Sequence, residues 1–329
     1  MTTPTGRNYS IDSLRFLCAL LVVIIHTRYF PLYAALEPFA RAAVPCFFMI
    51  SGYLMWDDHF GAHVRKSIPR VLWILFYSTL FYGVETFLKW KLGLMDFFIS
   101  SYVSLADVLL LNANPFVDHL WYLQAYLYVL LIALLLDRGG KSRWLFWAPV
   151  LYLLGLVVGK YGYWTAFDFP VEYSRNFLFV GLPCFSIGMM LRAWRRKHGS
   201  KMSLGGVAML LALATACSYV ERMWLSANEL QSQGDFFLTT PLVAVLLLEF
   251  FLCLRQRQPN IFSKVGRRDA LLIYVYHVLV LEMLFFVARH LLTLRAMDIY
   301  FWLAPFLAFF LTELCVVCYR RIFQRHERA

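Results

Sequence analysis

Residues 11–30 read IDSLRFLCALLVVIIHTRYF, a run in which most side chains are apolar. A transmembrane helix needs about 20 such residues to cross the hydrocarbon core. Further runs of this kind lie at 38–56, 71–90, 119–136, 144–160, 174–192, 203–221, 236–254, 270–288 and 299–318. The sequence therefore predicts an all-α protein, a polytopic transmembrane helix bundle of about ten spans.

The composition agrees with this prediction. Hydrophobic residues make up 61% of the 329 residues and charged residues 16%, whereas soluble domains have about 45–50% and about 25%. No linker or soluble appendage stands out, so we expect residues 1–329 to form a single domain. The sequence leaves the oligomeric state open.

The net charge of +11 follows from topology. Most of the Lys and Arg residues fall in alternate connections between the predicted spans, together with the C-terminal tail. Cytoplasmic loops carry such an excess, so we expect both termini in the cytoplasm. This distribution leaves no reason to expect a nucleic-acid partner. All seven cysteines lie in predicted spans and no metal-ligand spacing such as HExxH occurs, so we expect no metal cofactor.

Three ionisable side chains lie in the first predicted span. On a helix, Asp12, Arg15 and His26 fall on one stripe, with His26 about 16 Å beyond Arg15. Charged groups inside a membrane are costly and face a partner or a cavity. The stripe indicates either a polar channel with His26 as a general base or a structural Asp12–Arg15 pair with a hydrogen-bonded His26.

The second predicted span contains RAAVPCFFMISGY at residues 41–53. Pro45 and Gly52 interrupt an apolar helix, which membranes tolerate where backbone is buried in protein or lines a cavity. Ser51 and Gly52 would let another group approach closely. Considered alone, this segment favours helix packing through small residues.

Together these spans resemble the start of the acyltransferase-3 family of membrane O-acyltransferases. Arg15 and His26 match its Arg/Lys-x10-His element, and residues 44–52 match its VPxFFxxSG-like element. Lys66 to Arg70 sit where the family has a basic turn before the third helix. Residues 119–123 and 274–277 resemble its HLWFL and YxxH elements. The layout is similar to enterobacterial common antigen O-acetyltransferases.

The resemblance implies transfer of an acetyl group from acetyl-CoA to a hydroxyl of a cell-surface or lipid-linked glycan, in the bacterial cytoplasmic (inner) membrane. It implies His26 as general base or transient acyl carrier, and Ser51 or nearby backbone N–H groups as oxyanion donors. Arg15 and His119 complete the expected catalytic set. Two rival interpretations are a transporter or flippase for an acylated glycan and a non-enzymatic membrane module, such as a sensor or partner anchor.

For the phosphates of CoA we expect Arg15, Arg65, Lys66 and Arg70, since Arg binds phosphate through a planar fork. Arg65, Lys66 and Arg70 could equally serve topology alone.

For the acceptor we expect Trp121, Tyr122 and His277. His119 could also be a hydrated member of an interfacial aromatic belt, and His277 could form a structural pair with Tyr274. The sequence assigns no role to Glu85, Glu249, Glu282 and Glu313.

Overall fold

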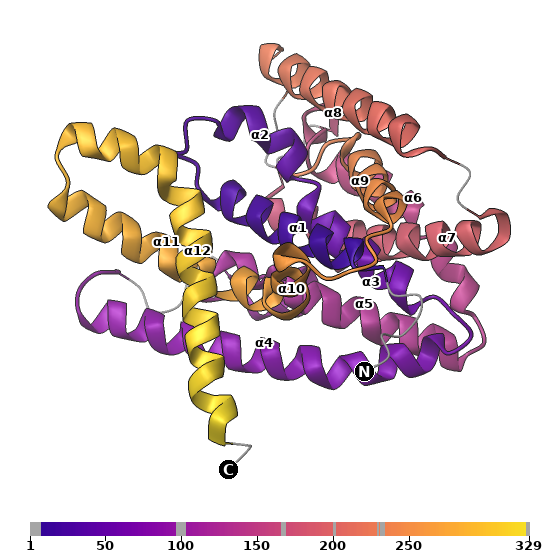
Figure 1. Ribbon diagram of the computed structural model, residues 1–329, viewed down its shortest axis with the longest axis horizontal. Coiled ribbons are helices and arrows are strands. Elements are labelled where there is room, and N and C mark those ends of the chain that lie inside the picture. The colour runs from indigo at the N-terminus through magenta and orange to yellow at the C-terminus, as the bar shows by residue number, and fades with distance from the viewer. Residues whose placement is uncertain are drawn as a thin grey trace. The chain divides into compact units, whose positions relative to one another are not determined.

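The computed structural model describes residues 8–96, 103–165, 169–199, 202–228, 230 and 234–326. These residues form helices and connections without a strand (Figure 1). The helices are α1 (Ser10–His26), α2 (Tyr33–Ala40), α3 (Ala43–Met55), α4 (Phe60–Lys91), α5 (Trp121–Arg138), α6 (Pro149–Val158), α7 (Leu182–His198), α8 (Leu204–Ala227), α9 (Thr240–Leu254), α10 (Ile261–Arg268), α11 (Ala270–Leu291) and α12 (Leu294–His326).

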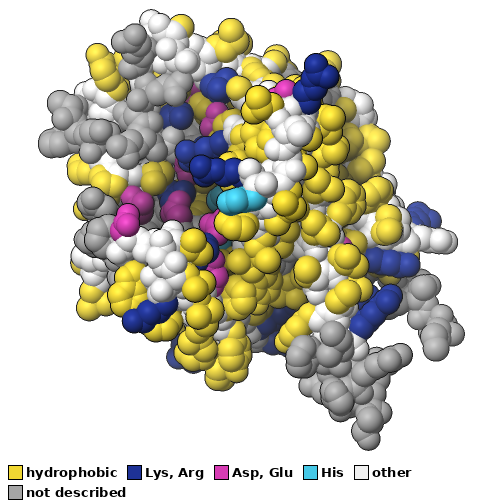
Figure 2. All heavy atoms as spheres, turned by 90° about the vertical axis from the view of Figure 1, so that its left-hand side faces the viewer, with side chains coloured by type: hydrophobic (Ala, Val, Ile, Leu, Met, Phe, Trp, Pro, Cys, Tyr) yellow, Lys and Arg dark blue, Asp and Glu magenta, His cyan; other side chains and the backbone are white. Residues whose placement is uncertain are grey.

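The prediction of a polytopic membrane helix bundle is confirmed. In the described residues, seven helical stretches are long and apolar enough to cross a membrane, and α6 and α9 are shorter apolar helices. The 17-residue α1 covers residues 11–26 of the first predicted span, 11–30, and is shorter than those seven stretches. Large hydrophobic side chains remain exposed along several helices, and they cover much of the face seen in Figure 2. A surface of this kind is suited to lipid.

Two details differ from the sequence-based boundaries. The second span is broken at residues 41–42 into α2 and α3, so Pro45 lies in the first turn of α3, where a missing N–H costs little. The third helix begins at Phe60 rather than near residue 71. Lys66 to Arg70 therefore lie on α4 itself and not in a turn before it, because charged residues end an apolar run without ending a helix.

The chain divides into two compact units. Unit 1 comprises residues 1–47, 202–216 and 242–329, and unit 2 comprises residues 48–201 and 217–241. The expectation of a single domain stays a prediction.

In unit 1, α10 lies against the start of α1. A Cβ atom at Gly266 would come 1.8 Å from the carbonyl oxygen of Asp12, so only glycine permits this approach. The connection after α9 is bound to the same end of α1, since the Gln256 N–H donates to Ser10 Oγ at 2.8 Å. Helices α11 and α12 lie side by side (Figure 1) and pack on α1 through a core that includes Val23, Ile273 and Phe309.

In unit 2, α3 and α7 cross at two glycines. A Cβ at Gly52 would lie 1.9 Å from the Phe185 carbonyl oxygen, and one at Gly188 would lie 2.0 Å from that of Met49. This reciprocal contact brings the two backbones together, as small residues do between membrane helices.

Candidate active site

The first two residues of the predicted stripe on α1 form an ion pair. The Arg15 guanidinium donates to the buried Asp12 carboxylate at 2.9 Å, while about a quarter of the Arg15 side chain is exposed (28%). The predicted i,i+3 pair therefore forms. The pair reduces the free-energy penalty of a charged Arg15 near the end of a membrane helix, because the opposite charge of Asp12 is adjacent.

His26 occupies the last position of α1 and its side chain is exposed. Its ring centroid lies 4.9 Å from that of His277 on α11, with the two planes inclined by 60°. Both residues belong to unit 1. Tertiary structure thus brings together two histidines that the sequence analysis assigned to separate roles.

The protonation pattern of His277 follows from its neighbours. Its Nδ1 lies 2.7 Å from the Tyr274 carbonyl oxygen and 3.1 Å from that of Ile273. Carbonyl oxygens only accept hydrogen bonds, so Nδ1 carries the proton. In the neutral ring the lone pair then resides on Nε2, and the fully buried imidazole is held in one tautomer.

A tyrosine pair extends this region beyond α1. The hydroxyl groups of Tyr29 and Tyr300 lie 3.2 Å apart. Burial raises the pKa of Tyr29, against a smaller opposing effect of the hydrogen bond to Tyr300, so the Tyr29 phenol stays protonated at neutral pH. Neither tyrosine is among the residues expected from the sequence: Tyr29 follows His26 by three positions, but no sequence spacing points to Tyr300.

Ser51 lies in unit 2, on the half of α3 that packs against α7. Gly52 is well inside α3, where a backbone N–H closes the helix's own hydrogen bond. The Ser51 hydroxyl is therefore a better candidate oxyanion donor than the backbone around Gly52. The glycine itself is explained by the helix crossing.

The element at 119–123 is buried in unit 2. His119 is 3% exposed and its ring meets that of Tyr82 edge-on at 5.2 Å, which disfavours a hydrated interfacial histidine. Tyr122 packs edge-on against Phe48 at 4.8 Å. The Trp121 ring lies 5.6 Å from the guanidinium carbon of Arg175.

Arg175 forms ion pairs with residues of two other segments of unit 2. Its guanidinium pairs with Asp118 and, at 3.1 Å, with Asp235. Burial lowers the pKa of Arg175, but the two carboxylates outweigh it and the net shift is upward. Asp118 therefore pairs with Arg175, and this arginine is a structural residue that sequence reasoning did not find.

The basic residues Arg65, Lys66 and Arg70 are exposed on the first three turns of α4, in unit 2. Arg15 belongs to unit 1. Each predicted donor-binding residue is thus placed, and their grouping around one donor stays a prediction.

Some of the carboxylates without an assigned role have ionic neighbours. Glu85 pairs with Lys89 on α4. Glu313 on α12 lies beside Asp269, whose Oδ1 is 2.5 Å from the Arg320 guanidinium. Burial raises the pKa of Asp269, although the nearby arginine charges oppose the shift. Their partners are consistent with structural roles.

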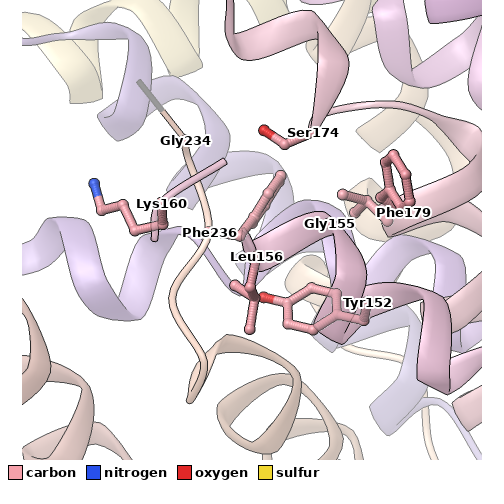
Figure 3. A pocket seen from close by; sticks show the side chains of 9 residues that line it. Tyr152, Gly155, Leu156, Lys160, Ser174, Phe179, Gly234 and Phe236 are labelled. Carbon is pink, nitrogen blue, oxygen red and sulfur yellow. The ribbon is translucent and has the colours of Figure 1, made fainter. Parts of the chain in front are cut away.

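A small pocket of unit 2 lies between α6 and the segment around Gly234 (Figure 3). Tyr152, Ser174 and Phe236 are among its lining residues, and its volume of about 10 Å³ suits a single water molecule. It is too small for an acyl donor or a sugar. Among the residues described, no group of three or more His, Cys, Asp or Glu side chains is arranged to hold a metal ion.

Residues 8–320 match the model of a protein family described as an acyltransferase domain, the acyltransferase-3 family. The chain belongs to this family. The match covers nearly the whole chain, and it includes His26, Ser51, His119 and His277, so the acyltransferase domain extends over both compact units.

Curated relatives of this acyltransferase domain include racemases. An amino-acid racemase of Enterococcus faecalis is 26% identical over 96% of this chain and 47% of its own length. A serine/alanine racemase of Enterococcus gallinarum is 28% identical over 82% of this chain and 40% of its own length. The chain thus spans less than half the length of either racemase. No solved structure matches it.

Proposed function

We propose that this protein is a membrane O-acetyltransferase that moves an acetyl group from acetyl-CoA to a hydroxyl of a cell-surface or lipid-linked glycan. The family supports acyl transfer in general. The observation that carries the proposal is the imidazole pair of His26 and His277, one exposed and one buried, at 4.9 Å.

In this mechanism His26 accepts the proton of the acceptor hydroxyl as its oxygen attacks the thioester carbon. The carbon–sulfur bond then breaks, and the CoA thiolate leaves and takes up the proton that His26 had accepted. General bases of this kind contribute about 10²–10⁴-fold to the rate. The Ser51 hydroxyl would donate to the developing oxyanion, as such donors do in a dry site.

His277 would act through His26. Its Nδ1 proton is committed to backbone carbonyl oxygens, so the ring keeps its orientation while His26 changes charge. With this fixed neutral imidazole beside it, the His26 side chain moves less and stays aligned with the acceptor hydroxyl. The acceptor would contact Trp121 and Tyr122, and the donor phosphates would contact Arg15, Arg65, Lys66 and Arg70.

The setting of the reaction is also a proposal. The helices support a multi-pass membrane protein, and we place it in the bacterial cytoplasmic membrane, in contact with membrane lipid and with both termini in the cytoplasm. That orientation gives it access to cytoplasmic acetyl-CoA.

The test is CoA thiol release by purified protein in detergent, supplied with acetyl-CoA and a lipid-linked glycan extract. Wild type should release thiol and His26→Ala should not. His290→Ala is the matched control, since His290 is an exposed histidine on α11. Glycan movement across a vesicle membrane without thiol release would support the transporter instead. Near-normal release by His26→Ala would overturn the mechanism.

A further inference from the structure

The α3–α7 crossing in unit 2 has a charged contact one turn beyond its glycines. Arg192 follows Gly188 by four positions and Tyr53 follows Met49 by four, so both continue the same contacting faces. The guanidinium carbon of Arg192 lies 5.2 Å from the Tyr53 ring centroid. One of its terminal nitrogens lies 3.5 Å from the Tyr53 hydroxyl, a long hydrogen bond.

The described residues supply no anionic partner for this guanidinium. Arg192 belongs to the apolar stretch Phe177–His198, and no carboxylate pairs with it in the part of the chain that the structure describes. Its Nε is buried and makes no hydrogen bond to a described residue. Leaving a buried donor without an acceptor is unfavourable, and more so when the group is charged. Among the residues that the structure describes, the Arg192 guanidinium therefore keeps a donor for a further acceptor.

Three carboxylates at this end of unit 2 have other partners. Asp58 accepts from Arg196 at 3.3 Å, and Asp57 lies 3.1 Å from the His63 ring. Burial raises the pKa of Asp57, but backbone and His63 contacts outweigh it and the net shift is downward. Asp137, which lies against Gly61 on α4, accepts from Ser142 at 3.0 Å.

The surroundings are otherwise cationic. The last turn of α7 holds Arg195, Arg196, Lys197 and His198. The first turn of α4 is anchored nearby, since the Phe60 ring lies 6.5 Å from that of Phe185 on α7. Arg65 and Lys66 follow within two turns of α4. An anion reaching Arg192 from this end would thus be attracted by several positive charges.

We propose that Arg192 and Tyr53 form a phosphate-binding site at the basic end of the α3–α7 pair. The planar guanidinium presents parallel N–H groups that match phosphate oxygens, and the Tyr53 hydroxyl supplies a further donor. The phosphate could belong to the acyl donor, in which case the inference rests on the proposed function. It could also belong to a lipid headgroup, which would need no acyl transfer.

The experiment compares wild type with Arg192→Gln and Arg192→Lys, and with Arg196→Gln as a matched control. Arg196 lies one turn further along α7, on an exposed ion pair. Titration calorimetry with CoA in detergent measures the donor arm. Native mass spectrometry with phosphatidylglycerol, against diacylglycerol without phosphate, measures the lipid arm.

We expect Arg192→Gln to weaken CoA binding about tenfold or more, since hydrogen bonds to charged groups are strong. The CoA affinity of Arg192→Lys should lie between those of wild type and Arg192→Gln. Arg196→Gln should change CoA affinity less than about threefold. Unchanged CoA binding with loss of phosphatidylglycerol would assign the phosphate to lipid. If wild type binds phosphatidylglycerol but no CoA, and Arg192→Gln binds neither, the phosphate site is supported and the proposed function is contradicted.

Arg192→Gln that leaves both CoA and phosphatidylglycerol binding unchanged would overturn the site. Each variant is checked by gel filtration and thermal unfolding. If Arg192→Gln does not fold, Tyr53→Phe removes only the hydroxyl donor, and binding should then weaken about two- to fivefold. No change in either ligand with Tyr53→Phe and Arg192→Lys would likewise overturn it.

Discussion

The His26 and His277 rings lie 4.9 Å apart, between the end of α1 and the middle of α11. Backbone carbonyl oxygens hold the buried His277 ring in one orientation, while the His26 side chain is exposed. His26 is therefore the ring of the pair that a substrate can reach.

We expect His26→Ala to lower CoA release at least about 100-fold, since the general base is lost. The side chain is exposed, so the unfolding temperature should change little. Thiol release and thermal unfolding, measured on the same preparation, check both expectations. A large loss of stability together with activity would indicate a structural role instead.

His277→Asn should lower kcat by about tenfold, because His26 loses the buried ring that fixes its alignment. The KM for acetyl-CoA should change less than about twofold. Separate measurement of kcat and KM, together with thermal unfolding, distinguishes this from a packing defect, which would lower the unfolding temperature. His290→Ala should leave both kinetic constants unchanged.

Gly188→Ala should destabilise the protein by about 1–3 kcal/mol, because the new Cβ would lie 2.0 Å from the Met49 carbonyl oxygen. Gly205→Ala is the control, since a Cβ there meets no atom within 4 Å. The difference in unfolding temperature between the two variants is the measurement. Equal stability of both would show that the close α3–α7 crossing is absent.

Arg175→Gln should cost about 1–3 kcal/mol, chiefly because it leaves the largely buried Asp235 carboxylate without its cation. Asp118 is 64% exposed and should add little. Arg196→Gln breaks an exposed pair with Asp58 and should cost less than about 1 kcal/mol. Denaturant or thermal unfolding of both variants tests the contrast. Similar small losses would mean that the Arg175 pairs add little to the fold.

Local patterns in the sequence gave much of the fold and part of the site. Each predicted span overlaps a helix, because the length of an apolar run is itself the constraint that a bilayer imposes. The Asp12–Arg15 pair was also predictable, since residues three apart on a helix are neighbours. The predicted start of the third helix was wrong, because hydropathy detects the residues that contact lipid and not the residue at which a helix begins.

The sequence by itself determined that this is a membrane helix bundle, where its apolar runs lie, and that Asp12, Arg15 and His26 share one helix. Only the tertiary structure decided that His26 meets His277, that Gly52 and Gly188 seat α3 on α7, and that Arg175 joins Asp118 to Asp235. The physical reason is the separation along the chain of the residues that interact. Helical periodicity is fixed by neighbouring residues, whereas contacts between helices depend on how distant side chains fill space together.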